Sequence, residues 1–114
     1  MIPEITVEDL AAKLKSPDQF ILLDVREPWE LALAKISDPR LLASPMSDLS
    51  RRGLDALPAA ARAENAQLYV LCHHGVRSGN VTGWLASQGW TNVFSVAGGI
   101  DAYAQRIDKS VGMY

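Results

Sequence analysis

Short runs of apolar residues alternate along the chain with segments whose apolar residues recur every three or four positions. The runs at residues 20–25, 41–43, 68–71 and 93–96 lie beside turn-forming residues and predict short, buried strands. The segments that separate these runs have helical spacing. The chain therefore alternates strand and helix four times.

The first predicted helix has both a start signal and a stop signal. Thr6 can cap the helix, and Asp9, three residues later, completes a capping-box pattern. Pro17 ends the helix, because proline disfavours helical geometry in the residue before it. The apolar stripe of this helix consists of Val7, Leu10, Ala11 and Leu14.

Four later helices are predicted from similar signals. Pro28 suits the first turn of a short helix, and Ser47 can cap a helix that breaks near Gly53 or Pro58. A fourth helix ends at Gly89, which suits a left-handed C-terminal cap. The last helix carries a stripe of Ile100, Tyr103, Ala104 and Ile107.

This order of elements predicts an α/β fold, with a mainly parallel central sheet and helices on both of its faces. The chain has no internal repeat or linker, so residues 1–114 are predicted to form one domain, with residues 109–114 as a C-terminal tail. In such sheets the reactive loops lie at the carboxyl ends of the strands. Residues 24–27 and 72–78 are expected there.

Composition and charge narrow the class of protein. A chain of 114 residues that is 48% apolar and 21% charged is an ordinary globular domain and not a disordered chain. A net charge of −2 provides no basic surface, so neither nucleic acid nor a membrane is an expected partner. The longest apolar run, residues 20–23, is too short to span a bilayer.

The single cysteine excludes an internal disulfide and a Cys-x-x-Cys redox pair. The N-terminal residues show no signal-peptide pattern, so a cytoplasmic location is expected.

Cys72 follows a predicted strand and precedes a glycine-containing loop, and the next helix is predicted to begin near Arg77 or Ser78. Successive backbone N–H groups in such a loop form an anion-binding nest, and the helix N-terminus adds positive partial charge. Both effects favour the thiolate and predict a reactive Cys72. Gly75 fits a position that needs a tight turn or a positive φ. Positive charge at the rim is expected from His73, His74 and Arg77.

This loop resembles the active-site loop of the rhodanese family of sulfurtransferases, whose pattern is Cys-x-x-Gly-x-Arg-Ser/Thr. Two other segments resemble family signatures: residues 24–27, Asp-Val-Arg-Glu, and residues 96–100 around a Gly-Gly pair. Tyr103 stands where the family often has tryptophan. The chain departs from the family at residues 35–39, Lys-Ile-Ser-Asp-Pro, where a Gly-His-Ile turn is frequent, so a different local loop is expected.

The resemblance implies a rhodanese-like fold and a two-step sulfur transfer that needs no cofactor and no metal. The Cys72 thiolate would attack the outer sulfur of a donor such as thiosulfate, and a thiophilic acceptor, cyanide or a thiol, would remove the sulfur from the persulfide. The implied partners are a small-molecule sulfur donor and acceptor, together with a sulfur-carrier or sulfur-donor protein. The active-site loop would comprise His73, His74, Gly75, Val76, Arg77 and Ser78, with supporting roles for Asp24, Arg26, Glu27, Gly98 and Gly99.

Two rival functions use a similar loop. In a sulfur-relay or regulatory module, a partner protein would charge Cys72 or bind around it. Cysteine-dependent phosphatases, including a group with a rhodanese-like fold, place five residues between the cysteine and the arginine. Only four residues separate Cys72 from Arg77, which argues against a pocket for a phosphate.

Several side chains have an alternative structural role. Arg77 either binds the donor anion or ties the loop to Asp24 or Glu27. Ser78 suits a helix cap better than a catalyst. The two loop histidines are either solvated or, for one of them, turned toward the substrate. A zinc site of Cys72, His73 and His74 is not expected, because structural zinc prefers four ligands in spaced pairs.

Overall fold

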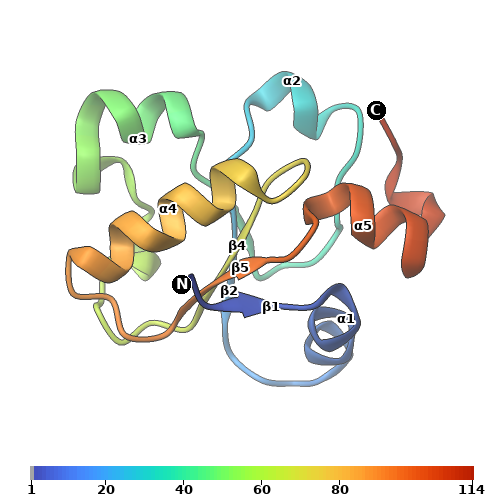
Figure 1. Ribbon diagram of the computed structural model, residues 1–114, viewed down its shortest axis with the longest axis horizontal. Helices are drawn as coiled ribbons and strands as arrows, with labels where there is room; N and C mark the ends of the chain where they lie inside the picture. The colour runs from blue at the N-terminus through green and yellow to red at the C-terminus, as the bar shows by residue number, and fades with distance from the viewer. Residues whose placement is uncertain (1) are drawn as a thin grey trace.

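The computed structural model describes residues 2–114. Five strands form one sheet in the order β1-β5-β4-β2-β3, and every neighbouring pair is parallel (Figure 1). The strands are β1 (Glu4–Ile5), β2 (Ile21–Asp24), β3 (Leu41–Ala43), β4 (Leu68–Leu71) and β5 (Val93–Val96).

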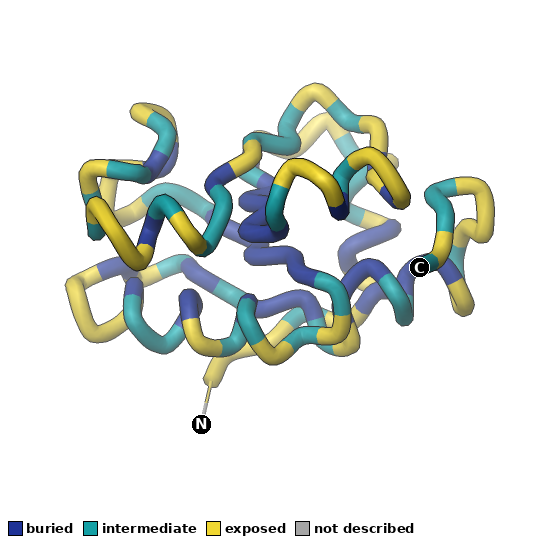
Figure 2. The backbone as a smooth tube through the Cα atoms, turned by 90° about the horizontal axis from the view of Figure 1, so that it is seen from above, coloured by how far each residue is buried: buried dark blue, intermediate teal, exposed yellow. Residues whose placement is uncertain are grey.

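Helices cover both faces of the sheet, and the strands lie buried between them (Figures 1 and 2). Helices α1 and α5 pack on one face, whereas α3 and α4 pack on the other. The helices are α1 (Val7–Lys15), α2 (Pro28–Leu31), α3 (Met46–Arg52), α4 (Val76–Ser87) and α5 (Gly99–Arg106), with 3-10 turns at Gly53–Ala56, Ala59–Ala61 and Lys109–Val111. The predicted α/β fold with a parallel sheet covered on both faces is confirmed.

Alternation along the strands divides the core in two. On β2, Leu22 packs under α1 and α5, and Leu23 packs under α3 and α4. On β4, Tyr69 and Leu71 pack in the same cluster as Leu22, under α1 and α5. Cys72, directly after β4, belongs to the second cluster, so its side chain is directed toward α4.

The local predictions had mixed outcomes. The cap of α1 is confirmed, because the Asp9 N–H donates to Thr6 Oγ1 at 3.1 Å. The cap of α3 is wrong: α3 begins at Met46 after Pro45, and Ser47 lies inside it with its hydroxyl donating to Glu27 Oε1 at 2.7 Å. The sequence pattern also missed β1, a two-residue strand that pairs with the edge of β5.

Residues 109–114 pack against the segment that follows α2. The Lys35 N–H donates to the Val111 carbonyl at 2.8 Å. Gly112 has a φ of +100°, and a Cβ at this position would lie 2.5 Å from the Leu33 carbonyl oxygen. This contact brings Tyr114 beside α2, where the C-terminal end of the chain is visible in Figure 1. Helices long and apolar enough to cross a membrane are absent from residues 2–114.

Candidate active site

The Cys72 sulfur lies at the carboxyl end of β4, almost completely buried at 1% exposure. The Gly75 N–H donates to Sγ at 3.0 Å, and the Cys72 thiol donates to Ser78 Oγ at 3.3 Å. Gly75 is the N-cap of α4 with a φ of +102°, a conformation that L side chains rarely adopt. The loop therefore curls around the sulfur and directs the N-terminus of α4 toward it, as the sequence predicted.

The Gly98–Gly99 turn packs against the backbone of this loop. The N–H groups of Ile100 and Asp101 donate to the carbonyls of Cys72 and His73 at 2.9 Å and 3.0 Å. Gly99 has a φ of +64°, and a Cβ there would overlap the His73 carbonyl and lie 2.6 Å from the Cys72 oxygen. These two carbonyls thus bond to the first turn of α5, which holds the loop in place while the Gly75 N–H faces the sulfur.

Arg77 is tied to Glu30 by a two-pronged ion pair. Its Nη1 and Nη2 each lie 2.7 Å from a different Glu30 oxygen, and the Glu30 side chain is only 4% exposed. Hydrogen bonds from Arg77 and the Glu27 N–H outweigh burial and lower the pKa of Glu30 to about 2. The predicted partners, Asp24 and Glu27, are wrong, because the capping box of α2 turns Glu30 toward α4 and Glu27 toward Ser47.

Asp24 and Arg26 form a fully buried ion pair behind that arrangement. Arg26 Nε and Nη2 donate to the two Asp24 oxygens at 3.0 Å and 2.8 Å. Burial lowers the pKa of Arg26, but the bonds to Asp24 outweigh it, so the pKa is raised overall. Arg26 Nη1 also donates to the Glu30 carbonyl at 3.4 Å. This pair fixes the turn from β2 into α2 and so positions Glu30.

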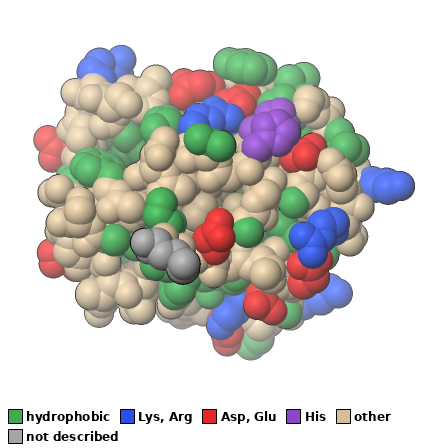
Figure 3. Space-filling model, viewed as in Figure 1, with side chains coloured by type: hydrophobic (Ala, Val, Ile, Leu, Met, Phe, Trp, Pro, Cys, Tyr) green, Lys and Arg blue, Asp and Glu red, His purple; other side chains and the backbone are tan. Residues whose placement is uncertain are grey.

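An aromatic column crosses the rim of the site. The rings of Tyr114 and His73 stack with centroids 3.8 Å apart, His73 stacks on His74 at the same distance, and Trp29 meets the edge of Tyr114. The Tyr114 hydroxyl donates to Glu30 Oε1 at 3.0 Å and accepts from Arg26 at 3.2 Å. The histidines reach the surface beside basic, acidic and hydrophobic side chains (Figure 3).

Glu30 and Tyr114 are site residues that were not predicted from the sequence. Glu30 could have been identified as the residue three positions after the N-cap Glu27 in a capping box, with Pro28 in the first turn of the helix. No sequence signal connects Tyr114 to Arg26, 88 positions away.

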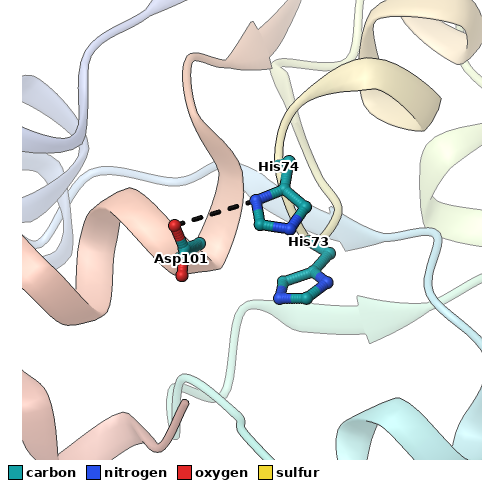
Figure 4. A group of neighbouring side chains, drawn as sticks. All are labelled: His73, His74 and Asp101. Carbon is teal, nitrogen blue, oxygen red and sulfur yellow. Dashed lines mark ion pairs between the residues drawn. The ribbon is translucent and has the colours of Figure 1, made fainter. Parts of the chain in front are cut away.

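His73, His74 and Asp101 form a group whose candidate ligand atoms lie within 4.8 Å of one another, and His74 Nδ1 is 3.7 Å from Asp101 Oδ2 (Figure 4). The two imidazoles lie nearly face to face, at 27°. Because imidazole binds a metal in the plane of its ring, two stacked rings do not converge on one ion without reorientation. Cys72 is not a member of this group.

The assembled site suits one chemical task. A single sulfur is surrounded by an N–H group, a hydroxyl and a helix N-terminus, which together favour negative charge on that sulfur. The site therefore has the parts of a nucleophilic thiolate centre.

Known proteins similar to this chain include a sulfurtransferase and a sulfur carrier protein. A sulfurtransferase from Allochromatium vinosum is 30% identical over 105 residues, covering 92% of this chain and 91% of that protein. A putative sulfur carrier protein from Bacillus subtilis is 32% identical over 87% of this chain, which spans only 49% of it. A rhodanese-like/PpiC domain-containing chloroplast protein from Arabidopsis thaliana is 34% identical over 99% of this chain, which spans 38% of it.

A crystal structure of a rhodanese-related protein from Thermoplasma volcanium is 30% identical, with a TM-score of 0.72, over 92% of this chain and 93% of that one. The family pattern of the rhodanese-like domain matches residues 6–106. The chain belongs to the rhodanese-like domain family.

Proposed function

We propose that this domain transfers sulfane sulfur from a donor such as thiosulfate to a thiophilic acceptor, and that Cys72 carries the sulfur as a persulfide. The observation that carries the proposal is the buried Cys72 Sγ, which accepts the Gly75 N–H at 3.0 Å at the start of α4. The sulfurtransferase and sulfur-carrier relatives support the same class of chemistry.

In the first step, the Cys72 thiolate attacks the outer sulfur of thiosulfate. A new S–S bond forms to Cys72, the bond to the sulfonate sulfur breaks, and sulfite leaves with the bonding electron pair. The terminal sulfur of the persulfide then carries the negative charge. The loop N–H groups and the positive end of α4 stabilise that charge, in the way an oxyanion hole stabilises a developing anion.

In the second step, cyanide or a thiolate attacks the terminal sulfur. The new bond forms to the acceptor, and the electron pair of the persulfide bond returns to Cys72 as a thiolate. The hydrogen bonds that prepare the nucleophile in the first step thus stabilise the leaving group in the second.

A sulfur-relay role is the second candidate, and one observation favours it. The charge of Arg77 is matched by Glu30, so Arg77 adds little net attraction for a small dianion such as thiosulfate. The two loop histidines are the other basic side chains of the loop. A donor protein that docks over the rim would depend less on such charge.

Steady-state release of thiocyanate from thiosulfate and cyanide tests the proposal. The native chain should turn over, and Cys72→Ser should lose at least roughly a thousand-fold of the activity while keeping its thermal unfolding temperature, because it lacks the nucleophile. Activity in Cys72→Ser would refute the mechanism. Hydrolysis of an aryl phosphate that requires Cys72 would instead indicate a phosphatase.

A further inference from the structure

Behind the Cys72 sulfur lie two buried hydroxyl groups in series. Ser78, on α4, has its Oγ 3.3 Å from Cys72 Sγ and 2.8 Å from Ser95 Oγ. Ser95 lies on β5, beside Val70 of β4, and both serines are fully buried. Within residues 2–114, the hydroxyl of Ser95 has one side-chain hydrogen-bond partner, which is Ser78.

The number of available protons fixes the direction of these bonds. The Ser78 hydroxyl has one proton and three acceptors in reach: Cys72 Sγ, the Gly75 carbonyl at 3.2 Å and Ser95 Oγ. A thiolate accepts only, so Ser78 must donate to it if the two are to bond. The Ser95 proton can then go only to Ser78 Oγ.

We propose that Ser95 is a positioning residue for Cys72 and acts through Ser78. By donating to Ser78 Oγ, Ser95 occupies a lone pair of that oxygen and leaves the Ser78 proton to point at Cys72 Sγ. A hydroxyl that accepts a hydrogen bond is also a better donor, so the pair stabilises the thiolate more than Ser78 does alone. In the thiol form, the Ser78 proton turns to the Gly75 carbonyl, and the thiol donates to Ser78 Oγ instead.

This inference rests on the proposed function for its biological meaning, because both sulfur-transfer steps place negative charge on the Cys72 sulfur. Its physical content is independent of sulfur transfer. Stabilising the thiolate raises the reactivity of Cys72 toward any electrophile at a given pH. The chain has one cysteine, so alkylation reports on Cys72 alone.

The test is a double-mutant cycle read out by the pH profile of Cys72 alkylation with iodoacetamide. Ser95→Ala should move the midpoint of the profile to higher pH and slow alkylation at pH 7 roughly five-fold, the size expected for one hydrogen bond. Ser78→Ala should have at least the same effect. Adding Ser95→Ala to Ser78→Ala should change the profile no further, because the path to the sulfur is already broken.

Ser44→Ala is the matched control. Ser44 is also a buried serine, but its hydroxyl bonds to the Ala56 carbonyl and not to the cysteine loop. This variant should leave the alkylation profile unchanged. Ser95→Thr, which keeps the hydroxyl on a strand, should restore the native profile.

Two results would overturn the assignment: a native profile in Ser95→Ala, or an equal shift when Ser95→Ala is added to Ser78→Ala. If Ser95→Ala shifts the profile while thiosulfate still fails to load the native Cys72, the positioning role stands and the proposed donor fails.

Discussion

The two halves of the candidate site contain different kinds of chemical group. The floor, made of Cys72, Gly75, Ser78 and Ser95, contains a sulfur, an N–H group and hydroxyls, and within residues 2–114 no charged side chain is hydrogen-bonded to the sulfur. The rim, made of His73, His74, Arg77, Glu30 and Tyr114, combines an ion pair with stacked rings.

The floor and the rim perform different tasks. On the floor, buried dipoles act on the sulfur at close range, where water does not weaken them. On the rim, the Arg77–Glu30 pair cancels its own charge and serves to anchor α4 to α2. We therefore expect the floor to set the reactivity of Cys72. We expect the rim to contribute to the stability of the domain and to determine which donors and acceptors reach the sulfur.

The largest loss of stability is expected at Gly99, in the turn that packs against the cysteine loop. Gly99→Ala places a Cβ against the carbonyls of Cys72 and His73, so the loop must move and the domain should lose about 4 kcal/mol in urea unfolding, together with most of its activity. Gly53→Ala is a matched control, because Gly53 has the same φ of +64° with open space around it. It should cost about 2 kcal/mol, the strain of the backbone alone, because a φ of +64° with a ψ of −142° is a conformation that L side chains rarely adopt. Equal losses in the two variants would contradict this role of Gly99.

The next effect tests whether the rim ion pair serves stability. Arg77→Ala leaves the buried Glu30 carboxylate without its cation and should cost about 3 kcal/mol at pH 7. The pKa of Glu30 is about 2 in the native protein, against an ordinary 4.5, so the stabilisation is complete above pH 4.5 and is lost as the pH falls toward 2. Urea unfolding of both proteins should therefore converge in acid.

Arg51→Ala provides the control for that pair, because the Arg51 side chain is 71% exposed and bonds to Asp48, whose side chain is 38% exposed. Its effect should stay below about 0.5 kcal/mol at every pH. A loss in Arg77→Ala that did not diminish in acid would show that the ion pair is not its cause.

The smallest loss of stability is expected from Tyr114, in the C-terminal tail of residues 109–114. Tyr114→Phe keeps the ring that stacks on His73 but removes the hydroxyl shared by Glu30 and Arg26, so thermal or urea unfolding should show a loss of about 1 kcal/mol. Tyr103→Phe is the control, since Tyr103 is a buried tyrosine but its hydroxyl has no hydrogen-bond partner within residues 2–114. If both variants match the native protein, the tail hydroxyl does not stabilise the rim.

The sequence predicted the loop part of the floor, because the contacts of that loop are local. The helix-cap role expected for Ser78 is wrong, since Gly75 is the N-cap of α4 and Ser78 lies inside the helix. Cys72, Gly75 and Ser78 lie within seven residues, and one loop with a helix start is enough to bring them together. Ser95 was missed, since a serine in a buried strand has no local signature. The four longer strands were also predicted, whereas β1 exists only because β5 offers an open edge.

The rim could not be derived from the sequence, because its contacts span the chain. Asp24, Glu27 and Glu30 are all acidic and close in sequence, and only the rotation of the short α2 decides which one meets Arg77. Tyr114 reaches the site through the packing of residues 109–114 on residues 33–35, a contact with no motif.

The most direct test of the central claim is the intact mass of the protein after incubation with thiosulfate, followed by a cyanide chase in the same tube. The account predicts a gain of one sulfur atom on the native chain and none on Cys72→Ser, with cyanide removing the sulfur as thiocyanate. A native chain that gains no sulfur, while Cys72 still reacts with iodoacetamide, would contradict thiosulfate as the donor and favour a relay role. A gain of sulfur on Cys72→Ser would contradict the persulfide mechanism itself.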